Sequence, residues 1–279
     1  MVYFSIISLT EYNSRYIIFV VNIMSFDFKN KTEYGFLRLE TVDSTNEYAK
    51  KCAVSGAKEA TVIIAERQTK GKGSKNRSFF SDADGIYMSV ILRPEISPTN
   101  SLFITTCAAV AVSRAIDKIC DKKTGIKWVN DIFLDGKKIC GILCESALRP
   151  NEERLEYAVL GIGINFSGSA NELPEDIKDI AGFIYEKSTD SKIKENLISE
   201  ILDNFFTLYK NLEKREFLDE YRSRSILIGK RVVCVGNGGD FNATVIDIDD
   251  HAHLIVKTDD GNIKNLYAGE VSLRLEKDN

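Results

Sequence analysis

The sequence is poor in histidine. Its two histidines, His251 and His253, both lie near the C-terminal end of the 279 residues. Serine–histidine catalysis, cysteine–histidine catalysis and histidine-based metal hydrolysis are therefore excluded from the larger part of the chain. The two histidines lie two residues apart in a predicted hairpin, where they can share a face. Because no third ligand accompanies them, a solvated turn is favoured over a metal site.

Cysteine is present without organisation. The six cysteines are scattered, with no C-x-x-C pair and no regular framework. This is typical of reduced thiols and predicts a cytoplasmic protein. Cys140 and Cys144 lie four residues apart on a predicted strand and share a face, but without a nearby histidine they do not predict a zinc site.

Long apolar runs and a strong net charge are also missing. The run Tyr16–Met24 is apolar but far shorter than the ~20 residues that a membrane-spanning helix needs, and no clear cleavage site follows it. A formal net charge of -4 gives no global electrostatic reason to bind nucleic acid or an anionic membrane. The 44% hydrophobic content is ample for a packed core. The sequence therefore predicts a globular protein with neither DNA nor a membrane as a partner.

The pattern divides the chain into three parts. Residues 1–34 fit poorly with the rest and are either an extended start before Met24 or a loosely attached β-prone arm. They leave no room before residue 36 for a helix-turn-helix module that reads DNA. Residues 35–225 hold the longer elements. Residues 226–279 alternate short β-runs with turns such as Asp259-Asp260-Gly261-Asn262, which predicts a small barrel.

Hydrophobic periodicity predicts the main elements of residues 35–225. Strands are expected over 36–40, 61–66, 85–92 and 156–162, and helices over 99–120 and 192–213. A further helix opens at Ser44, where Glu47 completes a capping box. Ser44 is therefore a helix N-cap in the simplest interpretation. The alternative is that this N-terminus, with Thr45 and Asn46, holds a polar or anionic ligand.

The most informative stretch runs from Lys127 to Glu145. Residues 126–133 and 138–145 are predicted as two strands of a hairpin around the turn pair Asp135-Gly136. Asn130 and Asp131 interrupt the first strand, and Lys138 lies on the second. Such groups must pair with one another or turn toward a ligand, because desolvating an unpaired one costs a few kcal/mol. A bulge in which Asn130 and Asp131 cap each other remains open at this point.

Two glycine-containing segments follow predicted strands. Residues 67–77 carry five basic residues together with Gly71 and Gly73. Such a loop suits a phosphate or carboxylate, although most basic loops are simply solvated, and the G-x-x-x-x-G-K-[ST] phosphate motif is absent. The second segment, Gly161-Ile162-Gly163-Ile164-Asn165, leads into Ser167-Gly168-Ser169 rather than a helix. A dinucleotide-binding fold is therefore not predicted.

Taken together, these polar interruptions resemble the biotin protein ligase family. They occur in the family's order and at its spacing, and the ordered set is far more specific than any one of its members. The matching segments are Asp43-Ser44-Thr45-Asn46, Glu66-x-Gln68 leading to Gly71-Lys72-Gly73, Lys127-Trp128-x-Asn130-Asp131, Gly136-Lys137-Lys138-Ile139-x-Gly141-Ile142-Leu143-x-Glu145, Gly161-x-Gly163-Ile164-Asn165 and Gly269-Glu270-Val271-Ser272-Leu273-Arg274.

The resemblance implies a fold and a reaction. The fold is α/β (α+β): a mixed β-sheet flanked by helices, similar to class II aminoacyl-tRNA synthetases, over residues 35–225, and an SH3-like β-barrel over residues 226–279. Biotin and ATP, with Mg²⁺, would give biotinyl-5'-AMP and pyrophosphate. A lysine of the biotin carboxyl carrier protein of acetyl-CoA carboxylase, or of a related biotin-dependent carboxylase, would then attack the mixed anhydride. Whether the chain forms a homodimer stays open.

The resemblance also implies site residues. Lys138 and Lys72 are the expected catalytic cations, and at 4 Å an ammonium is worth roughly 4 kcal/mol to a unit negative charge at an effective dielectric of 20. The expected biotin-binding residues are Ser44, Thr45, Asn46, Gln68, Lys72, Gly73, Ser74, Lys138 and Gly141. The expected ATP- and adenylate-binding residues are Lys72, Arg77, Trp128, Asn130, Asp131, Asn165 and Arg274. Asp131 is expected either to position magnesium or to hold a lysine.

Two segments depart from the family pattern. Its basic loop usually reads G-R-G-R-x-G-R, whereas residues 71–77 read G-K-G-S-K-N-R. Lys72 keeps the charge but loses bidentate geometry. Ser74 loses the charge at a position that helps the family retain the adenylate, so we expect weaker retention unless Lys75 or Arg77 substitutes. Val129 stands where the family usually has proline.

Three other classes compete with this interpretation. A lipoate protein ligase shares the architecture but would replace the ureido-binding set around Ser44 and Gln68 by a more apolar pocket. A biotin-responsive repressor would need an N-terminal DNA-binding domain. A non-catalytic biotin-binding protein would not require Lys72, Asn130 and Lys138 together. The sequence therefore favours the enzyme.

Overall fold

The computed structural model describes the backbone of residues 4–12, 15–23, 32–74, 77–81, 84–236, 239–268 and 271–275, and the side chains of those between 32 and 268. Its elements in chain order are β1 (Phe4–Tyr12), β2 (Arg15–Ile23), β3 (Gly35–Val42), α1 (Thr45–Val54), β4 (Thr61–Gln68), β5 (Asp84–Leu92), η2 (Pro98–Asn100), α2 (Leu102–Cys120), β6 (Gly125–Lys127), β7 (Asp131–Leu134), β8 (Lys137–Leu148), β9 (Leu155–Ser167), η3 (Ala170–Glu172), α3 (Ser191–Tyr209), η4 (Leu212–Lys214), α4 (Phe217–Ser223), β10 (Arg231–Gly236), β11 (Phe241–Ile248), β12 (Leu254–Thr258), β13 (Ile263–Leu266) and β14 (Val271–Leu275).

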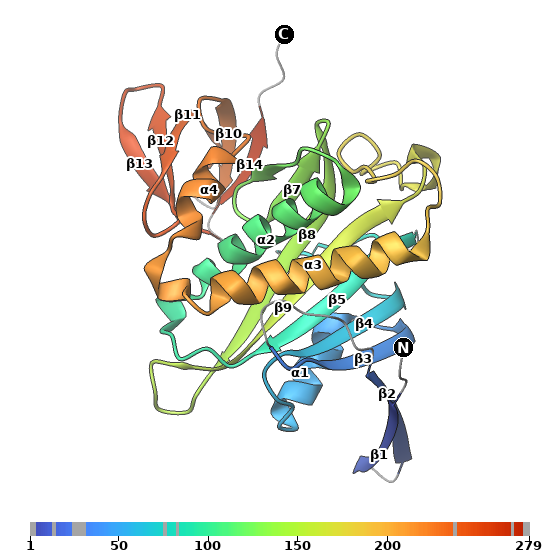
Figure 1. Ribbon diagram of the computed structural model, residues 1–279. Coiled ribbons are helices and arrows are strands. Elements are labelled where there is room, and N and C mark those ends of the chain that lie inside the picture. The colour runs from blue at the N-terminus through green and yellow to red at the C-terminus, as the bar shows by residue number, and fades with distance from the viewer. Residues whose placement is uncertain are drawn as a thin grey trace.

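A seven-stranded mixed sheet forms the centre of the larger part of the molecule, in the order β3-β4-β5-β9-β8-β7-β6 (Figure 1). β3 and β4 are parallel and are joined through α1, and the other neighbouring pairs of this sheet are antiparallel. The expectation of a mixed sheet flanked by helices is confirmed.

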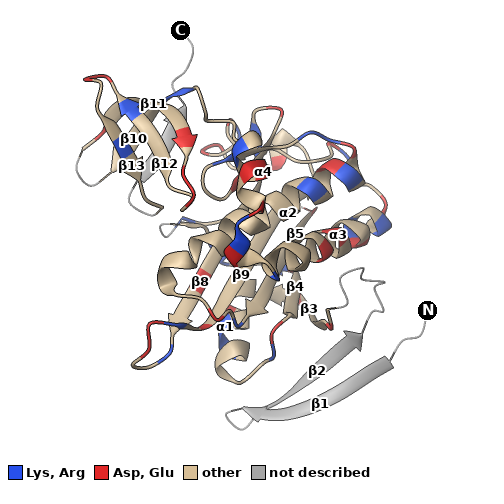
Figure 2. Ribbon diagram, turned by 60° about the vertical axis from the view of Figure 1, so that its left-hand side comes forward, with Lys and Arg blue, Asp and Glu red and all other residues tan. Residues whose placement is uncertain are grey.

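One face of this sheet is covered by long helices. α2 and α3 lie side by side across it (Figure 1). Successive strand residues point to opposite faces of a sheet, and Ile86, Met88 and Val90 of β5 enter the core beneath these helices. β5 carries no charged residue between Gly85 and Leu92, whereas α3 carries residues of both signs (Figure 2). This face is therefore a packing face.

The opposite face is covered only in part. Ala49 and Ala53 of α1 pack on Ile63, Ile91 and Val159 in a second, smaller core. Beyond α1, the same face of β8 and β9 carries Gly141, Gly161 and Gly163 instead of large side chains. This part of the sheet stays open, and the candidate site lies on it.

The C-terminal part is a five-stranded antiparallel sheet in the order β13-β12-β11-β10-β14, as expected for a small SH3-like domain. It is held against the larger part by side chains that bond to its backbone. The indole N–H of Trp128 donates to the carbonyl of Ala252 at 2.8 Å, and Arg222 Nε donates to the carbonyl of Ile248 at 2.6 Å. A single buried apolar core continues from the large sheet into this domain.

The hairpin predicted for residues 126–133 and 138–145 differs from expectation. Residues 126–133 do not form one strand, because the chain reverses at Trp128–Asn130 and β6 pairs with β7 so that Lys127 lies opposite Asp131. The reversal is held from β8: the Ile142 N–H donates to the Asn130 carbonyl at 2.9 Å, and Asn130 Nδ2 donates to the Ile142 carbonyl at 2.7 Å. The expected turn at Asp135-Gly136 is present, with both residues at positive φ.

The prediction of a capping box formed by Ser44 and Glu47 is wrong. Ser44 is the N-cap residue of α1, but among the described residues its hydroxyl caps no backbone N–H. Glu47 pairs instead with Lys50 and Lys72, because two ammonium groups attract a carboxylate more strongly than one backbone N–H does.

Several element boundaries also differ. α2 begins at Leu102 rather than residue 99, because Pro98 starts a separate 3-10 turn. α3 ends at Tyr209 rather than residue 213. β9 continues to Ser167, since Gly161 and Gly163 remain paired with β5 and β8 instead of ending the strand. Among the described helices, none is long and apolar enough to cross a membrane.

Candidate active site

A pocket opens on the uncovered face of the large sheet, between α1, the ends of β4 and β7, and the loop after β4. It contains about 470 Å³ of space not filled by protein atoms, part of it open to solvent. Its lining comprises Ser44, Thr45, Asn46, Gln68, Lys72, Gly73, Ser74, Phe79, Asn130, Lys138, Gly141, Ile142, Leu143, Gly161, Ile162 and Gly163. The expected biotin-binding residues are thus all brought together.

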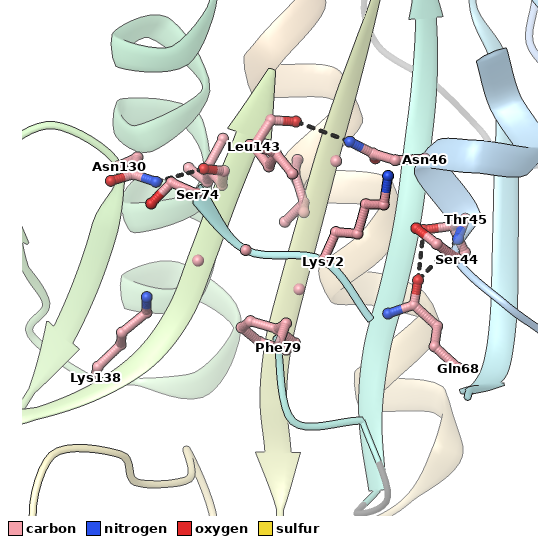
Figure 3. A pocket seen from close by; sticks show the side chains of 16 residues that line it. Ser44, Thr45, Asn46, Gln68, Lys72, Ser74, Phe79, Asn130, Lys138 and Leu143 are labelled. Carbon is pink, nitrogen blue, oxygen red and sulfur yellow. Dashed lines mark hydrogen bonds between the residues drawn. The ribbon is translucent and has the colours of Figure 1, made fainter. Parts of the chain in front are cut away.

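One end of the pocket is a buried hydrogen-bonding cluster (Figure 3). The Thr45 backbone N–H donates to Gln68 Oε1 at 2.8 Å, which fixes the orientation of that amide, and Thr45 Oγ1 lies 3.1 Å from the same oxygen. Ser89 Oγ lies 2.8 Å from Thr45 Oγ1 and 2.6 Å from Asn46 Oδ1. Gln68 Nε2 donates to Ser81 Oγ at 3.1 Å.

This cluster is short of hydrogen-bond donors. Ser89 and Thr45 each have one hydroxyl proton, yet these two protons serve three oxygen–oxygen contacts. A ligand that brings N–H groups therefore completes the cluster. Ser44 and the second N–H of Gln68 can donate to a ligand oxygen. This end of the pocket thus suits a group with N–H donors on either side of a carbonyl oxygen.

Asn46 holds the cluster in place. Its Nδ2 donates to the Leu143 carbonyl at 3.3 Å and to Glu145 at 2.9 Å. Its amide is therefore used by protein groups, and Asn46 ties the start of α1 to β8. Lys50 bonds to both Glu145 and Glu47, at 2.9 and 2.5 Å.

The basic loop after β4 is fastened to α1. Lys72 pairs with Glu47, and hydrogen bonds from Lys50 and Lys72 lower the pKa of the Glu47 carboxyl. The loop folds back on itself, because the Phe79 N–H donates to the Gly71 carbonyl at 2.9 Å and the Gly73 N–H to the Arg77 carbonyl at 2.7 Å. The Arg77 guanidinium donates to the backbone carbonyl and to the hydroxyl of Ser74.

The loop places an aromatic ring on a floor of glycines. A Cβ on Gly163 would lie 2.7 Å from the Phe79 ring, and one on Gly141 would lie 3.2 Å from it. A Cβ on Gly161 would lie 2.2 Å from Asn46 Oδ1. The glycines are required because the ring and the amide occupy the space that side chains would fill. The middle of the pocket is therefore apolar, between Phe79 and Leu143.

The other end of the pocket is cationic. Lys138 Nζ pairs with Asp131 at 2.6 Å. Lys127, Asp131, Gly141 and Gly163 form one row across β6, β7, β8 and β9. Burial lowers the pKa of Lys127, Asp131 opposes this, and the charges of Lys138 and Arg77 add to the lowering. Lys138 and Lys127 therefore flank one carboxylate beside the glycine floor, with the charge of Arg77 close enough to act on Lys127.

The remaining expected nucleotide-binding residues lie outside the described pocket lining. Asn165 is buried and donates to the Gly182 carbonyl at 3.0 Å, which holds residues 180–182 against the backbone of Lys138. Trp128 is buried against the C-terminal domain through Ala252. Arg274 pairs with Val233 through its backbone in β14, and its side chain, like Gly269, Glu270, Lys75 and Asn76, lies outside the described residues.

Sequence reasoning missed three residues of this site. Ser89 carried a usable signal, because its hydroxyl lies inside the apolar strand β5 and such a group needs a partner. Lys127 was part of a recognised motif but was given no role. Phe79 carried no signal, since its place on the glycines depends on how the loop folds.

The residues present allow only one kind of metal site. Among the described residues, no group of three His, Cys, Asp or Glu side chains could hold an ion. Mg²⁺ bound to a nucleotide needs only one or two carboxylates, since phosphate oxygens and water supply the rest. Asp131 fits that smaller role, although here it holds Lys138.

Comparison with known proteins gives two family matches. Residues 39–165 match the biotin/lipoate A/B protein ligase family, and residues 227–274 match the biotin protein ligase C terminal domain. The chain is 33% identical over 238 residues to the bifunctional ligase/repressor BirA of Bacillus spizizenii, spanning 84% of this chain and 72% of that protein.

Two further relatives are similar over most of the chain. The biotin--[acetyl-CoA-carboxylase] ligase of Mycobacterium tuberculosis is 31% identical over 230 residues, which cover 79% of this chain and 83% of that protein. The structure of the biotin protein ligase from Aquifex aeolicus in complex with biotin and ATP matches with a TM-score of 0.71 at 28% identity. That match covers 89% of this chain and all of the other.

Proposed function

Because the chain belongs to the biotin protein ligase family, we propose that the pocket holds biotin with its ureido ring at the Thr45–Gln68 end and its carboxylate at Lys138. The protein is an ATP-dependent ligase. It forms biotinyl-5'-AMP from biotin and ATP and then transfers biotin to a lysine of a carboxylase carrier protein. One observation supports the orientation above all: the donor-poor cluster and the cations lie at opposite ends of an apolar pocket.

The ureido end recognises biotin by hydrogen bonding. A ureido N–H supplies the donor that the Thr45 oxygen lacks, and Ser44 and Gln68 donate to the ureido oxygen. Ser89, which is fully buried and bonded to Thr45, orients the Thr45 hydroxyl. A buried polar group without a partner costs about 1–3 kcal/mol, so a ligand without the ureido ring is rejected. The apolar side chain of biotin then lies between Phe79 and Leu143.

The cationic end activates the carboxylate. Lys138 holds the biotin carboxylate beside the α-phosphate, so that the carboxylate oxygen attacks phosphorus and pyrophosphate leaves. Arg77 and Lys127 stabilise the phosphate charge, and Lys72 joins them by exchanging its partner Glu47 for a phosphate oxygen. Asp131 keeps Lys138 in place through their ion pair. Cations aimed at the reacting oxygens stabilise the charge that develops in the transition state.

Magnesium enters with the nucleotide in this proposal. Asp131 would supply a protein oxygen to the bound ion, and the ion would neutralise part of the phosphate charge. All six cysteines are free, which supports a reducing compartment such as the cytoplasm as the place of action. Trp128, Asn165 and Arg274 keep supporting roles: Trp128 fastens the C-terminal domain beside the site, Asn165 fixes the segment next to Lys138, and Arg274 is proposed as a nucleotide contact.

The test is biotin-dependent exchange of labelled pyrophosphate into ATP, with lipoate in a parallel reaction. We expect exchange with biotin alone. Lys138→Gln should reduce the exchange rate by about 100-fold, the usual effect of removing one group that stabilises transition-state charge. Lys137→Gln is the matched control, because that neighbouring ammonium donates to the carbonyls of Lys178 and Asp179 outside the pocket lining. Exchange with lipoate alone, or equal losses in both variants, would contradict the proposal.

A further inference from the structure

A second cleft adjoins the pocket on the side of the C-terminal domain. The two share Ser74, Asn130, Ile142 and Leu143 as lining residues. Asn130 and Ser74 lie at the end where Lys138 lies, away from the Thr45–Gln68 cluster (Figure 3). The cleft therefore meets the pocket at the carboxylate end, where the mixed anhydride forms according to the proposed function.

The far wall of this cleft carries a histidine held by a carboxylate. His253 and Tyr267 line the cleft from the C-terminal domain. His253 Nδ1 lies 3.0 Å from Asp249 Oδ2, and the backbone N–H groups of His251 and His253 both donate to Asp249 Oδ1 at 2.8 Å. The His253 ring packs edge-on against Tyr267 with centroids 4.4 Å apart. The contact with Asp249 fixes the ring orientation and leaves Nε2 as the nitrogen available to the cleft.

The second half-reaction needs a proton acceptor. A lysine with an ordinary pKa of about 10.4 is an ammonium at neutral pH and has no lone pair for attack. His251 and His253 are the only histidines of the chain, and His253 is the one that lines the cleft. The cleft also has an apolar wall, formed by residues such as Leu102 and Val129, that suits the four-carbon stem of a lysine.

We propose that the acceptor lysine of the carrier protein enters through this cleft and that His253 takes its proton. His253 Nε2 removes one proton from the ammonium, and the freed nitrogen lone pair attacks the carbonyl carbon of biotinyl-5'-AMP. The C–N bond forms as the bond from that carbon to the phosphate oxygen breaks. The surplus proton on nitrogen leaves with the phosphate of AMP, and the imidazolium returns its proton to water. This inference rests on the proposed function.

The groups around His253 favour this role. Burial opposes ionisation of Asp249, but the backbone N–H groups of His253 and His251 outweigh it and lower the pKa of that carboxyl. The described titratable and charged groups facing His253 are Asp249, His251 and Tyr267 of its own domain and Cys144 across the cleft. Arg222 of α4 pairs with Asp250 of the adjoining turn. Asp249 thus stabilises the imidazolium that forms.

The test uses the full chain loaded with biotinyl-5'-AMP in a single turnover. His253→Gln should slow transfer to the carrier domain of acetyl-CoA carboxylase by about 100-fold at neutral pH, the usual contribution of a general base. The loss should shrink as pH rises, because hydroxide then removes the proton. Transfer to hydroxylamine, which is already neutral near pH 7, should change less than twofold, as should pyrophosphate exchange.

His251→Gln is the matched control, because His251 stacks on His253 but is absent from the described lining of the cleft. His253→Ala with added imidazole is the second variant, and we expect imidazole to restore transfer to the carrier. Transfer by His253→Gln at the wild-type rate, or equal slowing with carrier lysine and hydroxylamine, would overturn the inference. If the wild-type chain showed no biotin-dependent pyrophosphate exchange, that result would instead contradict the proposed function.

Discussion

At the scale of single residues, the pocket has its shape because three positions lack side chains. Gly141, Gly161 and Gly163 lie on the open face of β8 and β9, where Phe79 and Asn46 occupy the space above them. The backbone conformation at these glycines is ordinary extended strand. Their requirement is therefore steric, and it belongs to the pocket rather than to the strands.

Gly163→Ala should displace Phe79 and weaken biotin binding at least tenfold, because the added methyl group would lie 2.7 Å from the ring. The free energy of unfolding should fall by less than about 1 kcal/mol, since a loop residue can move away where a core residue could not. Calorimetric titration with biotin and urea unfolding measure the two effects. Gly35→Ala is the control, because its methyl group meets only Thr61 at 3.7 Å. Unchanged biotin affinity in Gly163→Ala would contradict this account of Phe79.

Ser89→Ala should destabilise the protein and weaken biotin binding together. The substitution leaves Asn46 Oδ1 without its donor in a buried site, which costs about 1–3 kcal/mol. The matched control is Ser113→Ala, because the Ser113 hydroxyl is equally buried but has no hydrogen-bond partner among the described residues. Urea unfolding and biotin titration of both variants provide the measurement. Equal effects of the two substitutions would show that the Ser89 hydrogen bonds contribute nothing.

At the scale of elements, the loop after β4 connects both ends of the pocket. Lys72 fastens it to α1 through Glu47, Phe79 lies on the glycine floor, and Arg77 contacts Ser74. The guanidinium of Arg77 therefore lies beside the position where the sequence lost its expected positive charge. This geometry supports Arg77 as a partial substitute for the missing arginine.

Ser74→Arg should slow the release of biotinyl-5'-AMP, and Arg77→Gln should speed it, each by about three- to tenfold. One exposed or half-exposed charge contact contributes roughly 1 kcal/mol, which corresponds to changes of that size. Release is measured by chasing labelled adenylate from the enzyme with excess unlabelled adenylate. Lys70→Gln is a control for loss of loop charge, because Lys70 is an exposed residue at the start of the loop. Identical release rates of biotinyl-5'-AMP from wild type and both variants would contradict the expectation that Ser74 weakens retention of the adenylate.

At the scale of the whole molecule, the C-terminal domain and the large sheet share one apolar core. Trp128 lies at their junction, where its indole N–H donates to Ala252. It is also the single tryptophan of the chain. Its fluorescence therefore reports directly on whether the two parts are in contact.

Urea unfolding followed by Trp128 fluorescence and by far-ultraviolet circular dichroism should give coincident transitions, as expected for one cooperative unit. Arg222→Ala removes the bond to the Ile248 carbonyl and the pair with Asp250, and should lower both midpoints together. Lys230→Ala, an exposed residue of the linker to β10, is the control and should shift neither midpoint. A fluorescence transition well before the dichroism transition would mean that the C-terminal domain detaches independently.

The elements were predictable where the pattern is local. Alternation and helical spacing located the strands and long helices of residues 35–225 to within a few residues, and turn-rich β-runs located the small C-terminal sheet. The misses arose where distant groups compete for the same atoms. Glu47 bonds to Lys72 of a loop 25 residues away rather than capping its own helix, and the reversal at Trp128–Asn130 depends on bonds from Ile142.

The sequence by itself determined the chemistry of this protein: the ordered polar motifs, the absence of histidine from the larger part and the two lysines that face anions. These follow from residue identity and spacing, which folding does not change. Only the tertiary structure decided how those groups divide between binding and support. It assigned the Asn46 amide to protein partners, turned Trp128 toward the C-terminal domain, brought Phe79 onto the glycines and placed His253 beside the cleft. The reason is physical: hydrogen-bond partners and free space are properties of neighbours in three dimensions, and those neighbours lie far apart along the chain.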